Sequence, residues 1–289
     1  MDKRDFIKIL GISSVSMACT NPLGTLFDGK DSSEMMPVLF IGHGNPMYAI
    51  RDNEFTRKWA ELGRTLPKPK ALLCISAHWM TRNTTRVLAM ENPKTIHDFH
   101  GFPEELFTQQ YNAPGAPKFA KETQELIKTT AVGADLEQWG FDHGCWAPIQ
   151  RFYPDANIPL YQLSIDINKP PQYHYNLAKD LKALRKKGVL IMGSGNIVHN
   201  LRNMVGNLEM KYDWAVEFDE KVKQLISAND YDPLFDYKKL PGGSQSVPTN
   251  DHYLPMFYSL AVKDDKDELT YFNDQVVNGS MSMRSFIFS

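Results

Sequence analysis

The sequence predicts an α/β fold: a single domain with a central, mostly parallel or mixed sheet and helices on both of its faces. Three observations support this. Short apolar runs with little polar interruption are typical of strands that are covered on both sides. These runs alternate along the chain with helical patterns, as in sheets built from strand-helix-strand units. The chain of 289 residues is also long enough to bury a sizeable core.

The predicted strands come in order along the chain, each because an apolar run has strand length. They cover residues 37–42, 71–76, 86–90, 159–165 and 188–193. A last segment, "SMSMRSFIF" at 280–288, alternates between polar and apolar residues and predicts a late or edge strand.

The predicted helices lie between these runs, where apolar residues recur at helical spacing. They cover residues 53–64, 116–130, 172–187 and 212–227. The basic cluster Arg185-Lys186-Lys187 ends the third of them, where positive charge suits the helix dipole. Proline-rich and glycine-rich loops are predicted at 66–70 and 240–251, and the second is long enough to suggest a functional role.

The N-terminal segment 1–35 reads as an export leader or disordered N-terminus, and residues 36–289 as the folded domain. A charged start is followed by a weakly apolar stretch with small residues, and "KRDFIK" is similar to a twin-arginine signal with Lys3 replacing the first arginine. "SMAC" has the pattern of a lipoprotein cleavage site that would place a lipid anchor on Cys19. We therefore expect a periplasmic or exported protein, with a cytoplasmic one as the alternative.

The remaining composition argues against several partners. A net charge of −2 with singly scattered charges does not favour nucleic acid. No apolar run of about 20 residues follows the leader, so no membrane span is expected. The three cysteines, Cys19, Cys74 and Cys145, form neither a disulfide framework nor a C-x-x-C pair.

Four histidines stand at the ends of predicted elements. His43, His78 and His199 follow apolar strands, and in open α/β sheets ligands bind beyond the carboxyl ends of the strands. His252 lies in "PTNDHYLP", just before a helix that Pro255 is suited to open. We expect these four imidazoles to converge.

The other histidines lie in different surroundings. His97 and His100 belong to the aromatic loop "TIHDFHGFP", which suits a lid or pocket wall. His143 in "WGFDHGCW" has Asp142 beside it, a setting for a tuned acid or base. His174, on a predicted helix, is expected to be structural or solvent-facing.

Several competing motifs are missing. "GSGNIV" has Val198 where a dinucleotide loop needs its third glycine. No P-loop, H-E-x-x-H helix or G-x-S-x-G elbow is present, so Ser194 is not expected to act as a nucleophile.

Neutral imidazoles suit a divalent metal ion such as zinc or iron and leave its charge uncompensated. A catechol that loses a proton and chelates through both oxygens would compensate it and leave a position for dioxygen. Zinc cannot pass electrons to oxygen, so we expect Fe(2+) for ring cleavage even if Zn(2+) is the species found in purified protein.

Six motifs in order, "GHGNP", "SAHW", "TIHDFHGFP", "WGFDHGCW", "GSGNIVHN" and "DHYLP", resemble the 4,5-DOPA extradiol dioxygenase family within the class III extradiol ring-cleaving enzymes. The resemblance covers Met36 to Ser289. It implies an α/β fold, one divalent metal ion, and oxygen insertion next to the hydroxyls of a catechol such as DOPA, which gives a muconic semialdehyde.

The resemblance also assigns roles by motif. Metal binding falls to His43, His78, His199 and His252, proton handling to His143, and the substrate pocket to His97 and Asp98. The related class III enzymes hold iron with two histidines and a carboxylate, so His199 is either a ligand or a catalytic base beside the metal. His100 stands where the resemblance leads us to expect a small residue.

Two other functions stay open at this point. A zinc-dependent hydrolase on a similar sheet would need a carboxylate base, for which the motifs offer Asp142 or Asp251. A metal-binding or sensing protein without turnover would fit the leader but would leave His143 and the aromatic loop unexplained.

Overall fold

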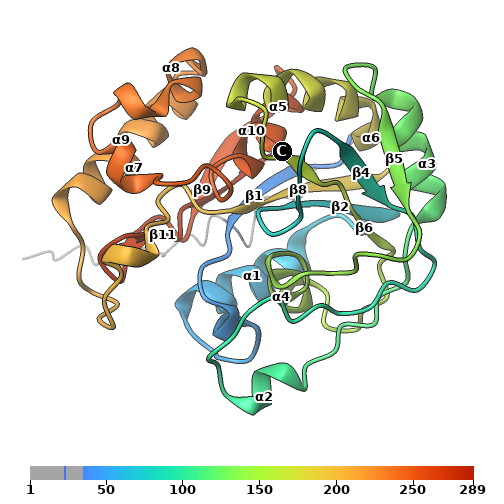
Figure 1. Cartoon of the computed structure of the whole chain (residues 1–289), viewed down its shortest axis with the longest axis horizontal. Coiled ribbons are helices and arrows are strands. Elements are labelled where there is room, and N and C mark those ends of the chain that lie inside the picture. The colour runs from blue at the N-terminus through green and yellow to red at the C-terminus, as the bar shows by residue number, and fades with distance from the viewer. Residues whose placement is uncertain (1–22, 24–34) are drawn as a thin grey trace, which may run out of the picture.

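The computed structural model describes residue 23 and residues 35–289, and within them it has the predicted α/β architecture. A central six-stranded sheet has the order β6-β2-β8-β1-β12-β9 (Figure 1). Its strands are β1 (Val38–Gly42), β2 (Ala71–Ser76), β6 (Leu160–Gln162), β8 (Val189–Gly195), β9 (Leu269–Phe272) and β12 (Ser285–Phe288). Strands β6, β2, β8 and β1 run parallel, whereas β12 is antiparallel to both of its neighbours. The sheet is therefore mixed.

Three short strand pairs lie outside this sheet. They are formed by β3 (Met80–Thr81) with β7 (Ile165–Asp166), β4 (Thr85–Leu88) with β5 (Val132–Asp135), and β10 (Val276–Val277) with β11 (Met281–Ser282).

Helices cover both faces of the sheet (Figure 1). The α-helices are α1 (Glu54–Thr65), α2 (Glu104–Phe107), α3 (Pro117–Leu126), α4 (His143–Phe152), α5 (Pro171–Ala178), α6 (Lys182–Lys186), α7 (Asp213–Ser227), α8 (Asp232–Phe235), α9 (Gly243–Ser246) and α10 (Pro255–Ala261). The described residues also form four short 3-10 helices: η1 (Pro46–Ala49), η2 (Lys179–Leu181), η3 (Leu201–Asn203) and η4 (Tyr237–Lys239).

Alternate residues of the central strands belong to two separate apolar clusters. In β1, Val38 and Phe40 pack in the cluster that includes α5, α6 and α10, whereas Leu39 and Ile41 pack in the cluster that includes α1 and α4. Burial on both faces explains why these strands are continuously apolar in the sequence.

The predicted elements differ from the observed ones in several places. The strand predicted at 159–165 divides into β6 and β7, and the helix predicted at 172–187 is interrupted by η2. The last strand, β12, is a late strand but not an edge strand, since it lies between β1 and β9. Helix α4 was not predicted, because Gly144 and Pro148 obscure its pattern.

The predicted leader, with Cys19 and its cleavage site, lies outside the described residues apart from Leu23 and Met35. Leu23 is 2% exposed and belongs to the same apolar cluster as α1 and α4. No described helix has the length and apolar character needed to cross a membrane.

Candidate metal centre

Parallel strands bring the predicted histidines to one edge of the sheet. Gly42 pairs with Gly195, and Ser76 pairs with Ser194, so β1, β2 and β8 end side by side. His43 follows β1 directly, and its backbone N–H donates to the Gly195 carbonyl at 3.0 Å. His78 follows β2 by two residues. The carboxyl edge of the sheet therefore carries the site, as the sequence predicts.

His252 reaches this edge from the segment before α10. Its carbonyl accepts a hydrogen bond from the Asn196 N–H at 2.9 Å, directly beyond the end of β8. A Cβ atom on Gly195 would lie 2.1 Å from that carbonyl oxygen, so only glycine permits this approach. Pro255 is at the start of α10, as predicted.

Three of the four predicted ligands form one group. His43, His78 and His252 each offer a ligand atom, and these atoms lie within 4.8 Å of one another. His199 is not part of this group and forms another with Asp251 and His252. Its ring stacks on that of His252, with 3.5 Å between the ring centroids.

Contacts on the far side of each ring indicate which nitrogen faces the centre. The hydroxyl of Ser194 donates to the Gly144 carbonyl at 2.5 Å, so its oxygen must accept from His43 Nδ1, 3.0 Å away. His78 Nδ1 lies 3.2 Å from Asp98 Oδ2, and His252 Nδ1 donates to Asp251 Oδ2. The hydrogen bonds of His43 and His252 thus place a hydrogen on Nδ1, and the ionised Asp98 carboxylate favours the same tautomer at His78, so that in the neutral form each Nε2 lone pair is bare.

This donor set fits a divalent cation. The Nε2 atoms of His43 and His78 lie 3.2 Å apart, a distance at which two bare lone pairs repel unless a proton or a metal ion binds between them. Three neutral imidazole nitrogens with one open side are a ligand set for zinc or iron(II). His43, His78 and His252 could therefore hold the metal, with His199 beside them.

The helix α4 starts at the centre and presents its first residue to it. Asp142 is the N-cap of α4 and is fully buried. Its carboxylate accepts from Ser76 Oγ at 2.6 Å, Gln162 Nε2 at 2.7 Å, Cys145 N at 3.1 Å and Trp139 Nε1 at 3.2 Å. Because four donors hold this carboxylate, Asp142 anchors the start of the helix and with it His143.

Proline inside α4 accounts for the bond to Ser194. Pro148 has no N–H to donate to the carbonyl of Gly144, four residues earlier, and so leaves that carbonyl free to accept from Ser194. A Cβ on Gly144 would also lie 2.7 Å from His78 Cδ2. Gly144 and Pro148 thus both help to position the histidines of the centre.

Asp98 connects the centre with His143. Its Oδ1 accepts from the His143 backbone N–H at 2.8 Å and lies 3.0 Å from His143 Nδ1, while Oδ2 faces His78. The Nδ1 contact has the distance of an ion pair but not the angle of a hydrogen bond, so this buried nitrogen has no hydrogen-bond partner among the described residues. His143 is therefore close to the centre with an unused polar atom.

The electrostatics favour neutral rings. Burial, followed by the neighbouring histidines, holds the pKa of His43 well below its usual value, and burial also lowers the pKa of His143, His199 and His252. Burial acts the same way on His78, but Asp98, Asp142 and Asp251 outweigh it, so the pKa of His78 is raised. The histidines hold the pKa of Asp98 and Asp251 below the usual range despite burial, so both stay ionised.

A cavity of about 340 Å³ opens in front of the four histidines, and we name it the catalytic cavity. Its lining comprises His43, Gly44, Asn45, Pro46, His78, Asp98, Phe99, His100, Phe102, His143, His199, Leu201, Met204, His252 and Met281. Asp98 lines this cavity. His97 does not: its Nε2 donates to the Gln109 carbonyl at 2.9 Å, and its ring packs behind Phe99.

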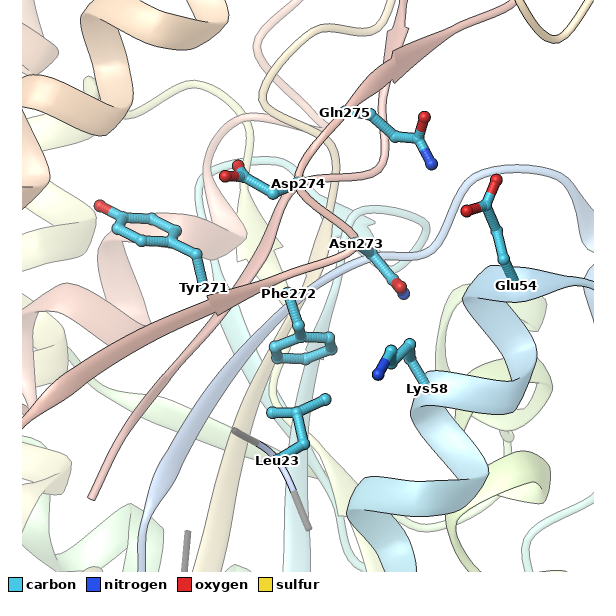
Figure 2. A pocket seen from close by; sticks show the side chains of 8 residues that line it. All are labelled: Leu23, Glu54, Lys58, Tyr271, Phe272, Asn273, Asp274 and Gln275. Atoms are coloured by element: carbon cyan, nitrogen blue, oxygen red, sulfur yellow. The ribbon is translucent and has the colours of Figure 1, made fainter. Parts of the chain in front are cut away.

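His174, expected to be structural or solvent-facing, is structural. It is fully buried, and its Nδ1 lies 2.9 Å from the Tyr258 hydroxyl. A further hollow lies between α1 and β9, where Leu23 sits beside Phe272 (Figure 2). No histidine lines it, and we assign it no chemistry.

Ser194 is the site residue that the sequence interpretation missed. It was considered as a nucleophile and set aside, but its hydroxyl instead orients His43. A polar residue inside an otherwise apolar, buried strand was the available signal, because such a group needs a hydrogen-bond partner.

Comparisons with known proteins show what the chain is similar to. Residues 37–276 match the family described as the catalytic LigB subunit of aromatic ring-opening dioxygenase. A protein of Escherichia coli K12 named "4,5-DOPA dioxygenase extradiol" is 45% identical over 88% of this chain and 95% of its own length. A protein of the same name from Mirabilis jalapa is 35% identical over 88% of this chain and 97% of its own.

A solved structure is also similar. The crystal structure of an uncharacterized protein from Escherichia coli K12 has a TM-score of 0.77 and 42% sequence identity to this chain. The similarity covers 88% of this chain and all of that one.

Proposed function

The chain belongs to the family of catalytic LigB subunits of aromatic ring-opening dioxygenases, and from this premise we propose that it cleaves a catechol such as DOPA by extradiol chemistry. Both atoms of dioxygen enter the product, and the ring bond next to the hydroxyls breaks to give a muconic semialdehyde. The observation that carries the proposal is the convergence of three bare Nε2 atoms beside an open cavity.

We propose that His43, His78 and His252 hold the metal, since the Nδ1 atom of each already faces an oxygen acceptor on its far side. Iron(II), when bound there, could pass electrons from the catechol to dioxygen, which zinc does not. Burial favours neutral rings at His43 and His252, so binding displaces few protons from them.

Two further histidines are placed to move the protons of the catechol. His199, stacked on His252, and His143, next to His78, both line the catalytic cavity. Burial lowers the pKa of both, so each is neutral near pH 7 and able to accept a phenolic proton. We assign one phenolic proton to His199, and to His143, which faces Asp98, we assign the acceptance of the other and its return to the opening ring.

The walls of the catalytic cavity suit an aromatic ring. Phe99, Phe102, Met204 and Met281 are part of the lining. Phe99 contacts the ring of His143 at 5.6 Å between centroids. Apolar walls exclude water and orient a planar substrate toward the centre.

The hydrolase alternative lacks a free carboxylate. Asp142 is held by four donors, and Asp98 and Asp251 are engaged by histidines. None of the three is available as the base that a metal-bound water would require.

The test is to load the protein with iron(II) without air, add a catechol, and then admit oxygen. Ring cleavage is expected to consume one oxygen molecule per catechol and to give a coloured semialdehyde. Zinc-loaded protein serves as the control and should bind catechol without consuming oxygen. If the iron-loaded protein consumes no oxygen with any of a panel of catechols, the proposal is wrong.

A further inference from the structure

A second cavity adjoins the catalytic one, and we name it the side cavity. It has a volume of about 390 Å³ and is lined by His199, Asn200, Leu201, Arg202, Pro248, Thr249, Asp251 and His252. His199, Leu201 and His252 line both cavities. The two spaces therefore meet at the stacked rings of His199 and His252 and at the side chain of Leu201.

Hydrogen bonds to the 240–251 loop hold the wall of the side cavity in place. The His199 N–H donates to the Ser246 carbonyl at 2.9 Å, and Asn200 Nδ2 donates to the Gln245 carbonyl at 2.7 Å. The Asn200 side chain in turn accepts from the Arg202 N–H at 3.1 Å. This loop, which the sequence marked as functional by its length, thus fixes the backbone from which Arg202 extends.

Arg202 differs from every other residue that lines the two cavities. Neither lining contains another arginine or a lysine. Within the described part of the chain, the exposed Arg202 guanidinium has no hydrogen-bond or ion-pair partner. Asp251, the acidic residue of the same cavity, is engaged by His252.

We propose that the side cavity binds the carboxylate at the end of a catechol's substituent, with Arg202 as its anchor. This rests on the proposed function, and it names the class of substrate: a catechol with a flexible acidic arm. The ring lies in the catalytic cavity, the arm passes Leu201, and the guanidinium receives the carboxylate. Arginine matches a carboxylate with two parallel N–H donors, a geometry that lysine does not provide.

The test measures binding without turnover, using zinc-loaded protein and two probes, dihydroxyphenylpropionate and its methyl ester. Wild-type protein is expected to prefer the acid. Arg202→Gln should weaken acid binding by about tenfold or more, with ester binding unchanged, because a charge-assisted pair is lost. Arg202→Lys should retain part of the preference. If acid binding is unchanged in Arg202→Gln, or if acid and ester weaken together, the inference is wrong.

His100 offers a control, since it is an exposed residue in the lining of the catalytic cavity and does not line the side cavity. His100→Ala should leave the ratio of acid to ester affinity as in the wild type. A collapse of that ratio in His100→Ala, and not in Arg202→Gln, would place the carboxylate near His100 and overturn the inference. Because zinc-loaded protein is used, the result is independent of whether the iron-loaded protein cleaves the ring.

Discussion

The orientation of three imidazole rings depends on three different hydrogen-bond acceptors. Ser194 accepts from His43, Asp98 faces His78, and Asp251 accepts from His252. A carboxylate can only accept, so two of the rings are oriented by charge. The hydroxyl of Ser194 could donate to His43 or accept from it. Because it donates its hydrogen to the Gly144 carbonyl, it accepts from His43.

Replacing Ser194 should therefore weaken metal binding without removing a ligand. In Ser194→Ala, His43 Nδ1 loses its acceptor, and the ring is free to place its hydrogen on Nε2 instead. We expect metal affinity to fall about 10-fold to 100-fold, as is typical when such an outer partner is lost. Competition with a chromogenic chelator measures the affinity, and nitrogen NMR of the metal-free protein reports the tautomer of His43.

Ser194→Thr is the control for this prediction, because it keeps the hydroxyl and should restore both the tautomer and the affinity. An alanine variant that keeps the hydrogen on Nδ1 and binds metal as the wild type does would contradict the role assigned to Ser194.

His143 should affect turnover but not metal content. Its side chain is not in the group formed by His43, His78 and His252, and proton transfer by such a residue typically contributes about 100-fold to 10,000-fold in rate. His143→Ala should therefore lose ring cleavage by such a factor while it binds iron normally. His43→Ala, by comparison, should lose the metal. Metal analysis and oxygen uptake on the same preparations distinguish the two effects.

At the scale of elements, the site depends on helix α4, which was not predicted from the sequence. A glycine and a proline within ten residues lower its helical character, yet Gly144 leaves room for His78, and Pro148 frees a carbonyl for Ser194. Glycine and proline are poor helix formers, and they stand at positions 144 and 148 because the placement of the histidines requires them there.

Pro148→Ala should lower the metal affinity without lowering the stability of the fold. The new N–H at position 148 would compete with Ser194 for the Gly144 carbonyl, as in an ordinary helix. Because proline in a helix interior costs about 3 kcal/mol, the variant is expected to unfold at the same or higher denaturant concentration. Its metal affinity should fall, by about tenfold, as the orientation of His43 is lost.

Denaturant titration and chelator competition on the same variant test both halves of this prediction. A parallel loss of stability and affinity would mean that Pro148 only shapes the helix.

The strands, by contrast, were predictable together with the residues at their ends. The apolar runs before His43 and His78 belong to strands buried on both faces, and the rule that ligands bind at carboxyl ends brought their histidines together. The division of the residues into ligands and neighbours was not predictable. It depends on side-chain placement, such as the stacking of His199 on His252, which no spacing encodes.

At the scale of the molecule, the site joins distant parts of the chain over a single sheet edge. His43 and His252 meet because β1 lies beside β8 and the segment before α10 crosses the end of β8. Helices pack on both faces of the sheet (Figure 1), and the buried histidines of the centre lie at this edge. Several histidines are consequently buried. Because burial lowers their pKa, the free energy of unfolding depends on pH.

His174 allows this link to be measured away from the metal centre. Burial lowers its pKa to about 4, whereas the unfolded chain should titrate near the ordinary value of about 6.5. The unfolded state therefore binds more protons between these values. Stability is complete above about pH 6.5, falls as the pH drops through this window, and reaches its full loss below about pH 4. At about pH 5 the expected loss from this group alone is about 2 kcal/mol.

His174→Gln should remove this contribution and retain a hydrogen-bond partner for the Tyr258 hydroxyl. The free energy of unfolding, from urea titration at about pH 7.5 and about pH 5, should drop less in the variant than in the wild type, by about 2 kcal/mol. The histidines of the metal centre titrate in both proteins and cancel in this comparison. Equal drops in the two proteins would show that His174 is charged in the folded state or that its burial does not affect its protonation.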